Sequence, residues 1–524
     1  MSFETEKKGL AGIIAASSVG TLIEWYDFYI FGSLATIIST KFFPAGNPTV
    51  ALLSTLATFA AGFVVRPFGA LFFGRLGDLI GRKYTFLVTL VLMGISTFLI
   101  GCIPSYESIG FFAPLLVLIL RLLQGLALGG EYGGAATYVA EHSPAERRGF
   151  WTSWIQTTAT VGLFVSLLVI ISTKGAMSDA DFSDWGWRVP FWISIIMVGI
   201  SIIIRMRMQE SPLFAKVKAE GKTSVNPLKE SFGHRLNFKF VLLALFGATM
   251  GQGVVWYTGQ FYALSFIQNT LSVDVAQASK LIMWALLFGT PFFVVFGALS
   301  DKIGRKWIML IGMLVAIVSY RSIYSKMFDA GSLSKKTEIA ANTQVNTTIA
   351  ADPKHAGDSI RTTITMKEYE DGTKAKFTKK ETIHADATKA DPKKDIVETK
   401  AVTLDNSSYW TLIWMVFIQV IFVTMVYGPI AAFLVEMFPT RIRYTSMSLP
   451  YHIGNGIFGG LLPAIATFLA TKATQANEAA KAAGTALPYD KPFLEGLWYP
   501  IIVAAVCLVI GIFYINGEDN RTED

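Results

Sequence analysis

The sequence is poor in charged residues and has almost no cysteine. Only 16% of its 524 residues are charged, whereas 52% are hydrophobic and the mean hydropathy is +0.47. This balance excludes an ordinary soluble domain and indicates a chain that crosses a membrane many times. The two cysteines, Cys102 and Cys507, are too few for a disulfide framework and lack metal-ligand spacing, so we expect no metal and no cofactor.

Motifs of enzyme chemistry are lacking as well. The sequence has no phosphate-binding loop of the Walker type and no nucleophile elbow, so we expect neither an ATP-driven pump nor an enzyme. The isoelectric point of about 9.1 is compatible with nucleic-acid binding, but lysines and arginines in cytoplasmic loops explain it equally well. We therefore expect the lipid bilayer, and no nucleic acid, as a partner.

Twelve apolar stretches are long enough to cross a bilayer, which takes about 20 residues in a helix. Lysines and arginines gather in alternate loops, so the positive-inside rule places both termini in the cytoplasm. The sequence therefore predicts an all-α membrane protein. Its expected spans are 12–39, 50–74, 84–103, 110–135, 151–173, 188–206, 238–268, 278–300, 305–325, 409–436, 445–470 and 494–515.

One loop differs from the others. Residues 326–408, between the ninth and tenth spans, are polar and nearly balanced in charge, and the orientation places them outside the cytoplasm. Apolar and polar residues partly alternate around Asp371 and Gly372, which predicts a β-hairpin there. A disordered linker is the alternative.

The two halves of the chain repeat one motif. GRLGDLIGRK begins at Gly74 and GALSDKIGRK at Gly297, with seven of the ten positions identical. The sequence EHSP at 141–144 recurs as EMFP at 436–439, and the offset has then grown from 223 to 295 residues. This growth is close to the length of the polar loop, which we therefore interpret as an insertion into the second half.

Such a repeat predicts a molecule of two six-helix bundles with a central site between them. The first bundle would comprise residues 1–206 and the second residues 238–524, with the insertion inside it. Residues 207–237 would form a cytoplasmic linker.

Several segments outside the insertion form a distinctive set. They are EWYDFYIFG at 24–32, RPFGALFFGRLGDLIGRK at 66–83, RLLQGLALGGEYGGA at 121–135, WGWRVPF at 185–191, ESPLF at 210–214 and EMFPTRIRYTS at 436–446. This set resembles the major facilitator superfamily and, within it, the metabolite:proton symporter family of 2-oxoglutarate, citrate, shikimate, proline and betaine permeases. The resemblance implies a twelve-helix transporter of the cytoplasmic (inner) membrane that works by alternating access, usually as a monomer.

The repeated motif has a mechanical interpretation. Its glycines allow tight turns and close helix approach, and its acid can pair with a basic residue or a helix N-terminus. The resemblance implies a latch that holds the cytoplasmic side closed, and a generic charged turn is the alternative. The residues expected in this gate are Gly74, Gly77, Asp78, Gly81, Arg82 and Lys83 in the first half, and Asp301, Gly304, Arg305 and Lys306 in the second.

Glu24 and Asp27 lie three residues apart in the first span, so they share one face of that helix. In lipid each would cost about 2.5 to 3.5 kcal/mol, so they must face a watery cavity or pair with an arginine. Arg66 and Arg121 are the basic residues that we expect at mid-span in the first half. We expect Asp27, then Glu24, to carry a proton, and the resemblance implies that Arg121 takes part; a static ion pair is the alternative.

The second half lacks such acids, because aligning Trp256 with Trp25 puts valine and threonine in their places. It would then supply neutral and aromatic recognition, although each residue alone fits core packing as well. His452 could take part in proton coupling, with a packing role as the alternative. The residues expected at the substrate are Tyr26, Tyr29, Arg66, Gln124, Gln252, Trp256, Tyr257, Gln260, Tyr427 and Asn455.

The sequence thus predicts proton-coupled symport of a small polar metabolite, either a carboxylate or a zwitterion such as proline or betaine. The partners would be that metabolite and protons. Two alternatives stay open. One is an uncoupled facilitator or a sugar porter, which WGWRVPF and EMFPTRIR also resemble. The other is a metabolite-sensing membrane receptor that binds its ligand with the insertion.

Overall fold

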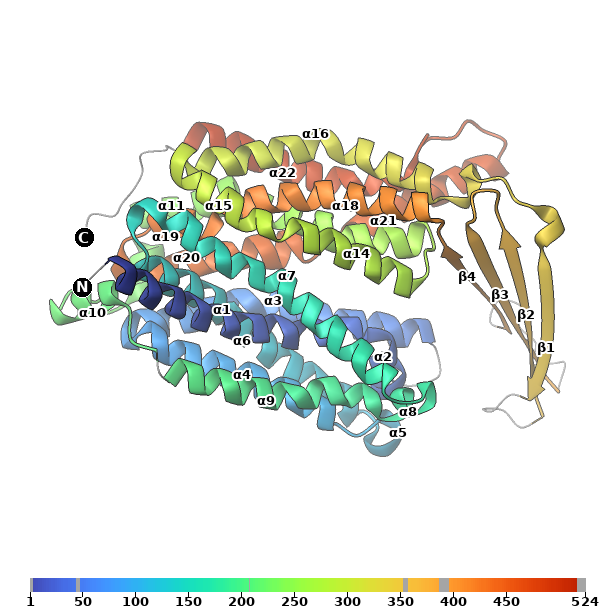
Figure 1. Cartoon of the computed structure of the whole chain (residues 1–524), viewed down its shortest axis with the longest axis horizontal. Coiled ribbons are helices and arrows are strands. Elements are labelled where there is room, and N and C mark those ends of the chain that lie inside the picture. Colours follow the sequence, from blue (N-terminus) through green and yellow to red (C-terminus); the bar gives the residue numbers. More distant parts are fainter. Residues whose placement is uncertain (1–2, 44–47, 207, 352–356, 386–394, 516–524) are drawn as a thin grey trace.

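The structure, a computed structural model, describes residues 3–43, 48–206, 208–351, 357–385 and 395–515. Its long helices run roughly side by side in one elongated bundle, and a β-sheet stands beyond one end of it (Figure 1). We call this the sheet end. The opposite end, where α1 begins and α22 finishes, is called the terminus end.

The helices of the first half pack mainly on one another: α3 packs on α6, α1 on α7, and α4 on α6 and α9. In chain order they are α1 (Phe3–Ser33), α2 (Ala35–Phe42), α3 (Pro48–Ile80), α4 (Arg82–Cys102), α5 (Tyr106–Ile109), α6 (Phe112–His142), α7 (Arg148–Gly175), α8 (Asp179–Asp184) and α9 (Val189–Met206). The short helix α10 (Pro212–Ala219) follows, within the predicted linker.

The second half repeats this arrangement with more interrupted helices, and its first long segment runs from Arg235 to Thr270. Its helices are α11 (Arg235–Ala244), α12 (Met250–Tyr257), α13 (Ala263–Ser265), α14 (Val275–Gly289), α15 (Pro291–Ile303), α16 (Arg305–Gly331), α18 (Asn406–Tyr427), α19 (Ile430–Glu436), α20 (Arg443–His452), α21 (Leu462–Ala482) and α22 (Trp498–Tyr514).

Eleven helical segments in the described part of the chain are long and apolar enough to cross a membrane. α1 is not among them, although it has 31 residues. Its acids Glu24 and Asp27 lower its hydropathy. With α1 included, the order of long helices matches the twelve predicted spans. Several helices extend further than predicted, as α6 does to His142, because a helix continues into the polar interface where hydropathy no longer marks it.

Two spans that face each other across the second half contain π-helical turns. The seventh contains η4 (Leu245–Thr249), η5 (Thr258–Tyr262) and η6 (Phe266–Thr270), and the eleventh contains η11 (Ile453–Gly459). α12 packs on η11. Turns of this kind are rare and occur often at functional sites.

The insertion between α16 and α18 contains an antiparallel sheet in the order β1-β2-β3-β4. The strands are β1 (Gln344–Ala351), β2 (Ser359–Glu368), β3 (Lys374–Ile383) and β4 (Ile396–Thr403). β2 and β3 form a hairpin whose turn holds Gly372 at a φ of 89°. The sequence predicts this hairpin alone. β1 gives no alternating signal, because all of its residues are exposed.

Candidate functional site

The first copy of the repeated motif binds the opposite half of the molecule at the terminus end. Asp78 accepts hydrogen bonds from the backbone N and the Oγ1 of Thr445, at 2.9 and 2.7 Å. Arg82 pairs with Asp78 at 3.0 Å, and its Nη2 donates to the carbonyl of Thr440 at 2.9 Å. Glu141 joins the group through Arg443, 3.1 Å away. All of these contacts except the Arg82–Asp78 pair cross from the first half to the second.

The second copy makes the reciprocal contact. Asp301 accepts from the backbone N–H groups of Gly149 and Phe150, at 2.7 and 2.8 Å, at the N-terminus of α7. Arg305 lies 3.2 Å from Asp301 and 2.8 Å from Glu436. Each aspartate therefore lies at the N-terminal end of a helix in the other half, where the exposed N–H groups and the helix dipole favour a carboxylate.

The predicted gate glycines occupy positions where a larger residue would clash or strain the backbone. Gly77 lies against Tyr444, because an added Cβ would come within 2.2 Å of its ring. Gly81 and Gly304 have φ values of 123° and 95°, which L side chains rarely adopt. Gly74 lies close to the backbone of Thr445.

The two predicted gate lysines stay within their own halves. Lys83 donates to the last carbonyl of α9, that of Met206, and Lys306 donates to carbonyls at the end of α22. Each lysine thus stabilises a helix C-terminus and does not bridge the two halves.

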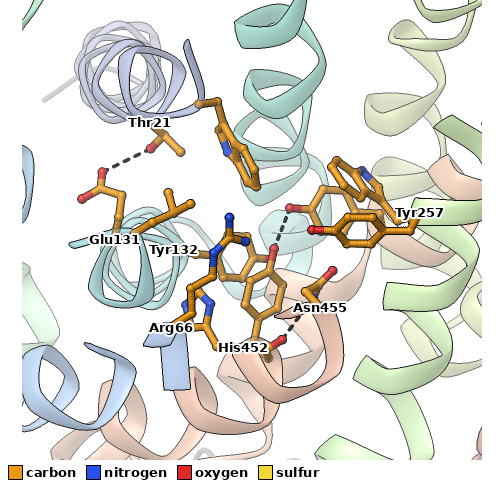
Figure 2. A pocket seen from close by; sticks show the side chains of 12 residues that line it. Thr21, Arg66, Glu131, Tyr132, Tyr257, His452 and Asn455 are labelled. Atoms are coloured by element: carbon orange, nitrogen blue, oxygen red, sulfur yellow. Dashed lines mark hydrogen bonds between the residues drawn. The ribbon is translucent and has the colours of Figure 1, made fainter. Parts of the chain in front are cut away.

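A central cavity lies between the halves (Figure 2). It is small, with about 10 Å³ for the centres of water-sized spheres, which is room for about one water molecule. Aromatic contacts connect the halves around it, including Trp25 with Trp256 at 6.1 Å and Tyr132 stacked on Tyr451 at 3.5 Å between ring centroids. Its lining residues are Thr21, Trp25, Arg66, Leu128, Glu131, Tyr132, Trp256, Tyr257, Tyr427, Tyr451, His452 and Asn455.

Arg66 is the cation of this cavity. It is 2% exposed, and its guanidinium lies 4.4 Å from the ring of Phe28 and 4.2 Å from that of Phe63. Its Nε and Nη2 have no hydrogen-bond partner. Among the described residues, no carboxylate lies within ion-pair distance of Arg66.

Other buried polar atoms around the cavity are also unpaired within the described chain. Both ring nitrogens of His452 and the indole N–H of Trp256 have no partner, and both residues line the cavity. The hydroxyl of Tyr29 and the side-chain amide of Gln260 also have no hydrogen-bond partner among the described residues. Buried polar groups are nearly always hydrogen-bonded, so such a cluster marks a place for a polar ligand.

Five predicted substrate residues are hydrogen-bonded to protein groups, and one of them, Gln124, bonds Arg121 and Thr97 within the first half. Gln252 and Asn455 exchange two amide hydrogen bonds, at 3.1 and 2.8 Å, and so connect α12 to η11. Tyr26 donates to the carbonyl of Pro190 in α9 and lies away from the cavity. The hydroxyl of Tyr427 bonds that of Tyr451 at 2.7 Å at the cavity wall. The other predicted substrate residues belong to the unpaired cluster or lie beside it. Those with unpaired polar atoms are Tyr29, Arg66, Trp256 and Gln260, and Tyr257 lines the cavity with Arg66 and Trp256.

Asp27 and Arg121 occupy the interior of the first half and do not line the cavity. Asp27 accepts a hydrogen bond from Ser194 of α9 at 2.6 Å. Arg121 donates to Gln124 at 2.9 Å, and Gln124 donates to Thr97 at 2.7 Å. Hydrogen bonds to neutral side chains thus replace the direct pair between an acid and an arginine that the sequence suggests.

Comparison with known proteins identifies this architecture. Residues 13–349 match the family described as "Sugar (and other) transporter". The chain belongs to this family, which is part of the major facilitator superfamily. It is 37% identical over 314 residues to the "Proline/betaine transporter" of Escherichia coli K12, covering 58% of the chain and 62% of that protein. It is 36% identical over 312 residues to the "Alpha-ketoglutarate permease" of the same organism, 59% of the chain and 70% of that protein.

Solved structures agree on this fold. The proton:xylose symporter XylE bound to 6-bromo-6-deoxy-D-glucose gives a TM-score of 0.60 at 15% identity, over 97% of this chain and 95% of that one. A partially occluded, inward-open XylE from Escherichia coli gives 0.59 over 97% and 98%. The predicted superfamily and its twelve-helix fold are therefore confirmed. The chain spans less than two thirds of the length of the proline/betaine transporter that it matches.

Two residues of the first half, Arg205 and Glu131, are missing from the site that the sequence predicts. Arg205 lies at the very end of the sixth expected span, where the sequence gives it no role in the site, yet it is 1% exposed in the last turn of α9. There its Nη2 pairs with Glu131 at 2.5 Å. Gly20 allows this, because an added Cβ would lie 2.1 Å from the guanidinium of Arg205. Glu131 appears in the sequence only as part of a polar stripe on its helix.

Proposed function

We propose that this transporter carries a small carboxylate or zwitterion into the cell by proton-coupled symport. The observation that supports this most is Arg66, a buried guanidinium at a central cavity with no carboxylate partner among the described residues. A buried charge of this kind is costly, whereas an anionic group in the cavity would neutralise it. The planar guanidinium suits a carboxylate, which it can bind with two hydrogen bonds.

The rest of the cavity favours a compact substrate with a second polar or cationic group. Trp25 and Trp256 stand close together on its wall, near Tyr257, and aromatic faces attract an ammonium group. Relatives named proline/betaine transporter and alpha-ketoglutarate permease fit both parts of this chemistry. A sugar has no charge to offer Arg66, so a sugar porter fits the cavity less well.

The contacts between halves support alternating access. At the terminus end, Asp78 and Asp301 each hold a helix of the opposite half, so opening that end requires both contacts to break. We place this end in the cytoplasm with both termini, following the positive loops, and the sheet outside the cytoplasmic membrane. Substrate and proton together would shift the population toward the state in which the terminus end opens. We propose a monomer as the working unit.

The first experiment is uptake by purified protein in liposomes under an inward proton gradient. The panel is labelled proline, betaine, 2-oxoglutarate, citrate, shikimate and glucose. We expect one carboxylate or zwitterion to accumulate above its equilibrium level only with the gradient. Equilibration that is indifferent to the gradient would make the protein a facilitator. Accumulation of glucose instead would contradict the role given to Arg66.

A further inference from the structure

A buried acidic pair lies behind the cavity, within the first half. Glu24 on α1 and Glu131 on α6 are both fully buried, and their carboxyl groups face each other. Neither oxygen of Glu24 accepts a hydrogen bond from another residue of the described chain. Two carboxyl groups can bond each other only when one of them carries a proton.

One cation belongs to this pair. Arg205 on α9 approaches Glu131 with two nitrogens, at 2.5 and 3.3 Å, and its Nη1 also donates to the carbonyl of Phe86 at 2.7 Å. Thr89 on α4 and Thr21 on α1 donate to Glu131 at 3.0 and 3.5 Å. Glu131 therefore accepts hydrogen bonds from side chains of three helices. Glu24 can form a hydrogen bond with Glu131 only when the two carboxyl groups share a proton.

The charge of the cluster depends on that proton. Two carboxylates and one guanidinium leave one negative charge, and a single proton makes the cluster neutral. The other titratable groups facing it are Asp27 on α1 and Tyr444 on α20, whose hydroxyl donates to the carbonyl of Gly130. Neither supplies a positive charge. A buried, water-poor site favours the neutral state of such a group.

The cluster is connected to the cavity. Glu131 and Thr21 line the cavity that Arg66 and His452 also line, and in Figure 2 the hydroxyl of Thr21 points toward the carboxylate of Glu131. Glu131 is therefore the acid of the pair that borders the cavity, where a proton can be exchanged with cavity water. By contrast, Asp27 accepts from Ser194 and does not line the cavity.

We propose that Glu24 and Glu131 together bind the transported proton, with Arg205 as their fixed counter-charge. The proton arrives from cavity water on the sheet side, forms one O–H bond shared between the two carboxyl groups, and leaves to water on the terminus side when that end opens. The neutral cluster permits the closed state, and the charged cluster opposes it. This inference rests on the proposed symport, and it replaces Asp27 by Glu131 as the main proton-binding residue.

The test measures proton binding directly. Infrared spectra of the purified protein in lipid nanodiscs, recorded over a pH series, report the C=O band of protonated carboxyl groups. We expect a titrating band that is lost in both Glu24→Gln and Glu131→Gln. Glu24→Gln keeps the pair of Glu131 with Arg205, which is neutral without a proton, and Glu131→Gln keeps the carboxylate of Glu24 near Arg205 as a counter-charge, so both variants should fold. Asp27→Asn and the exposed Glu107→Gln should keep the band.

A titrating band that survives in Glu24→Gln and Glu131→Gln, or disappears in Asp27→Asn, would overturn the proposal. Transport assays on the same proteins separate it from the proposed function. With labelled proline, betaine and 2-oxoglutarate, Glu24→Gln should lose gradient-driven accumulation far more than exchange. If wild-type uptake ignores the gradient while the band behaves as expected, symport fails but the proton site stands.

Discussion

Asp78 and Thr445 lie in opposite halves of the molecule, yet the carboxylate of Asp78 accepts both the backbone N–H and the hydroxyl of Thr445. Asp301 makes the equivalent pair of bonds with Gly149 and Phe150. Two equivalent contacts, each made by one copy of the same motif, therefore close the terminus end. Separating the two halves at this end would break four hydrogen bonds to charged acceptors.

Asp78→Asn should shift the transporter toward a state that is open at the terminus end. Hydrogen bonds to a charged group contribute about 1.5–3 kcal/mol each, so a shift of roughly 10- to 100-fold is expected. The reporter is a cysteine at Thr137, a buried residue of α6 whose hydroxyl contacts Met447 across the halves. Its alkylation rate by a soluble maleimide, in a background without Cys102 and Cys507, should rise with the substitution.

The control for this experiment is Asp329→Asn, an exposed aspartate near the C-terminal end of α16. It should leave the alkylation rate of the cysteine unchanged. Asp301→Asn should act in the same direction as Asp78→Asn. An unchanged rate in both gate variants would show that these contacts do not hold the end closed.

Arg66→Gln should abolish substrate binding while the protein stays folded. Truncating one partner of a buried charged pair costs about 2–5 kcal/mol, most of it felt as weaker binding. Arg66→Lys should recover only part of the affinity, because lysine lacks the planar fork that binds a carboxylate. Uptake kinetics in proteoliposomes measure both. The exposed Arg75→Gln on the same helix is the control, and equal uptake by Arg66→Gln would contradict the role of this arginine.

The contacts of the repeated motif between the halves were largely predictable from sequence, because the chemistry of the motif is local and occurs twice. An aspartate, two basic residues and glycines at fixed spacing define a charged turn, and the repeat pairs each copy with the other half. The sequence could not show that Lys83 and Lys306 serve helix ends in their own halves. That depends on where α9 and α22 finish, which local spacing does not encode.

The interior of the first half was less predictable. Counting mid-span charges missed Arg205, because the arginine comes at the end of its span and its side chain extends back into the bundle across Gly20. Likewise, the spacing of Gln252 and Asn455 indicates two cavity residues, but their amides satisfy each other. Which polar groups pair is a property of the folded packing, and it lies beyond helical periodicity.

Gly20→Ala tests how closely Arg205 crosses α1. An alanine Cβ would come within 2.1 Å of the guanidinium, so Arg205 must move away from Glu131. Overpacking of this kind costs about 1–3 kcal/mol, and the melting temperature in detergent should fall. Gly12→Ala on the same helix is the control, because nothing lies within 4 Å of its Cβ. It should be neutral or slightly stabilising, since alanine is the better helix former. Equal melting temperatures for the two variants would contradict this contact.

The far end of the sheet should respond to pH through His384. This side chain is 17% exposed and lies between Asp395, 3.0 Å away, and Asp358, 2.7 Å away, so it connects the ends of three strands. Hydrogen bonds to Asp395 and then Asp358 raise the pKa of His384. Protonated His384 therefore stabilises the folded sheet fully below the ordinary histidine pKa of about 6.5. This stabilisation is lost as the pH rises through the higher pKa that His384 has in the folded sheet.

Hydrogen exchange of residues 357–385, corrected for the intrinsic effect of pH, checks this expectation. Protection should fall as the pH rises past the folded pKa of His384. In His384→Gln the protection should be lower at acid pH and should not change over the same range. The opposite trend, with protection rising toward alkaline pH, would mean that the histidine is neutral when the sheet is folded.

Removing the sheet should leave transport intact. The insertion joins the bundle at its base, where Lys336 pairs with Asp405 at 3.2 Å and Val402 bridges to Val273. The variant replaces residues 333–404 by a short Gly/Ser linker. It keeps Asp405, which caps α18 by accepting from the N–H groups of Ser407 and Ser408. The central cavity has no lining residue from the sheet. Uptake in proteoliposomes should therefore keep its affinity and its dependence on the proton gradient, with a modest loss of thermal stability. Loss of ligand binding with an intact helical bundle would instead favour a receptor that captures its ligand on the sheet.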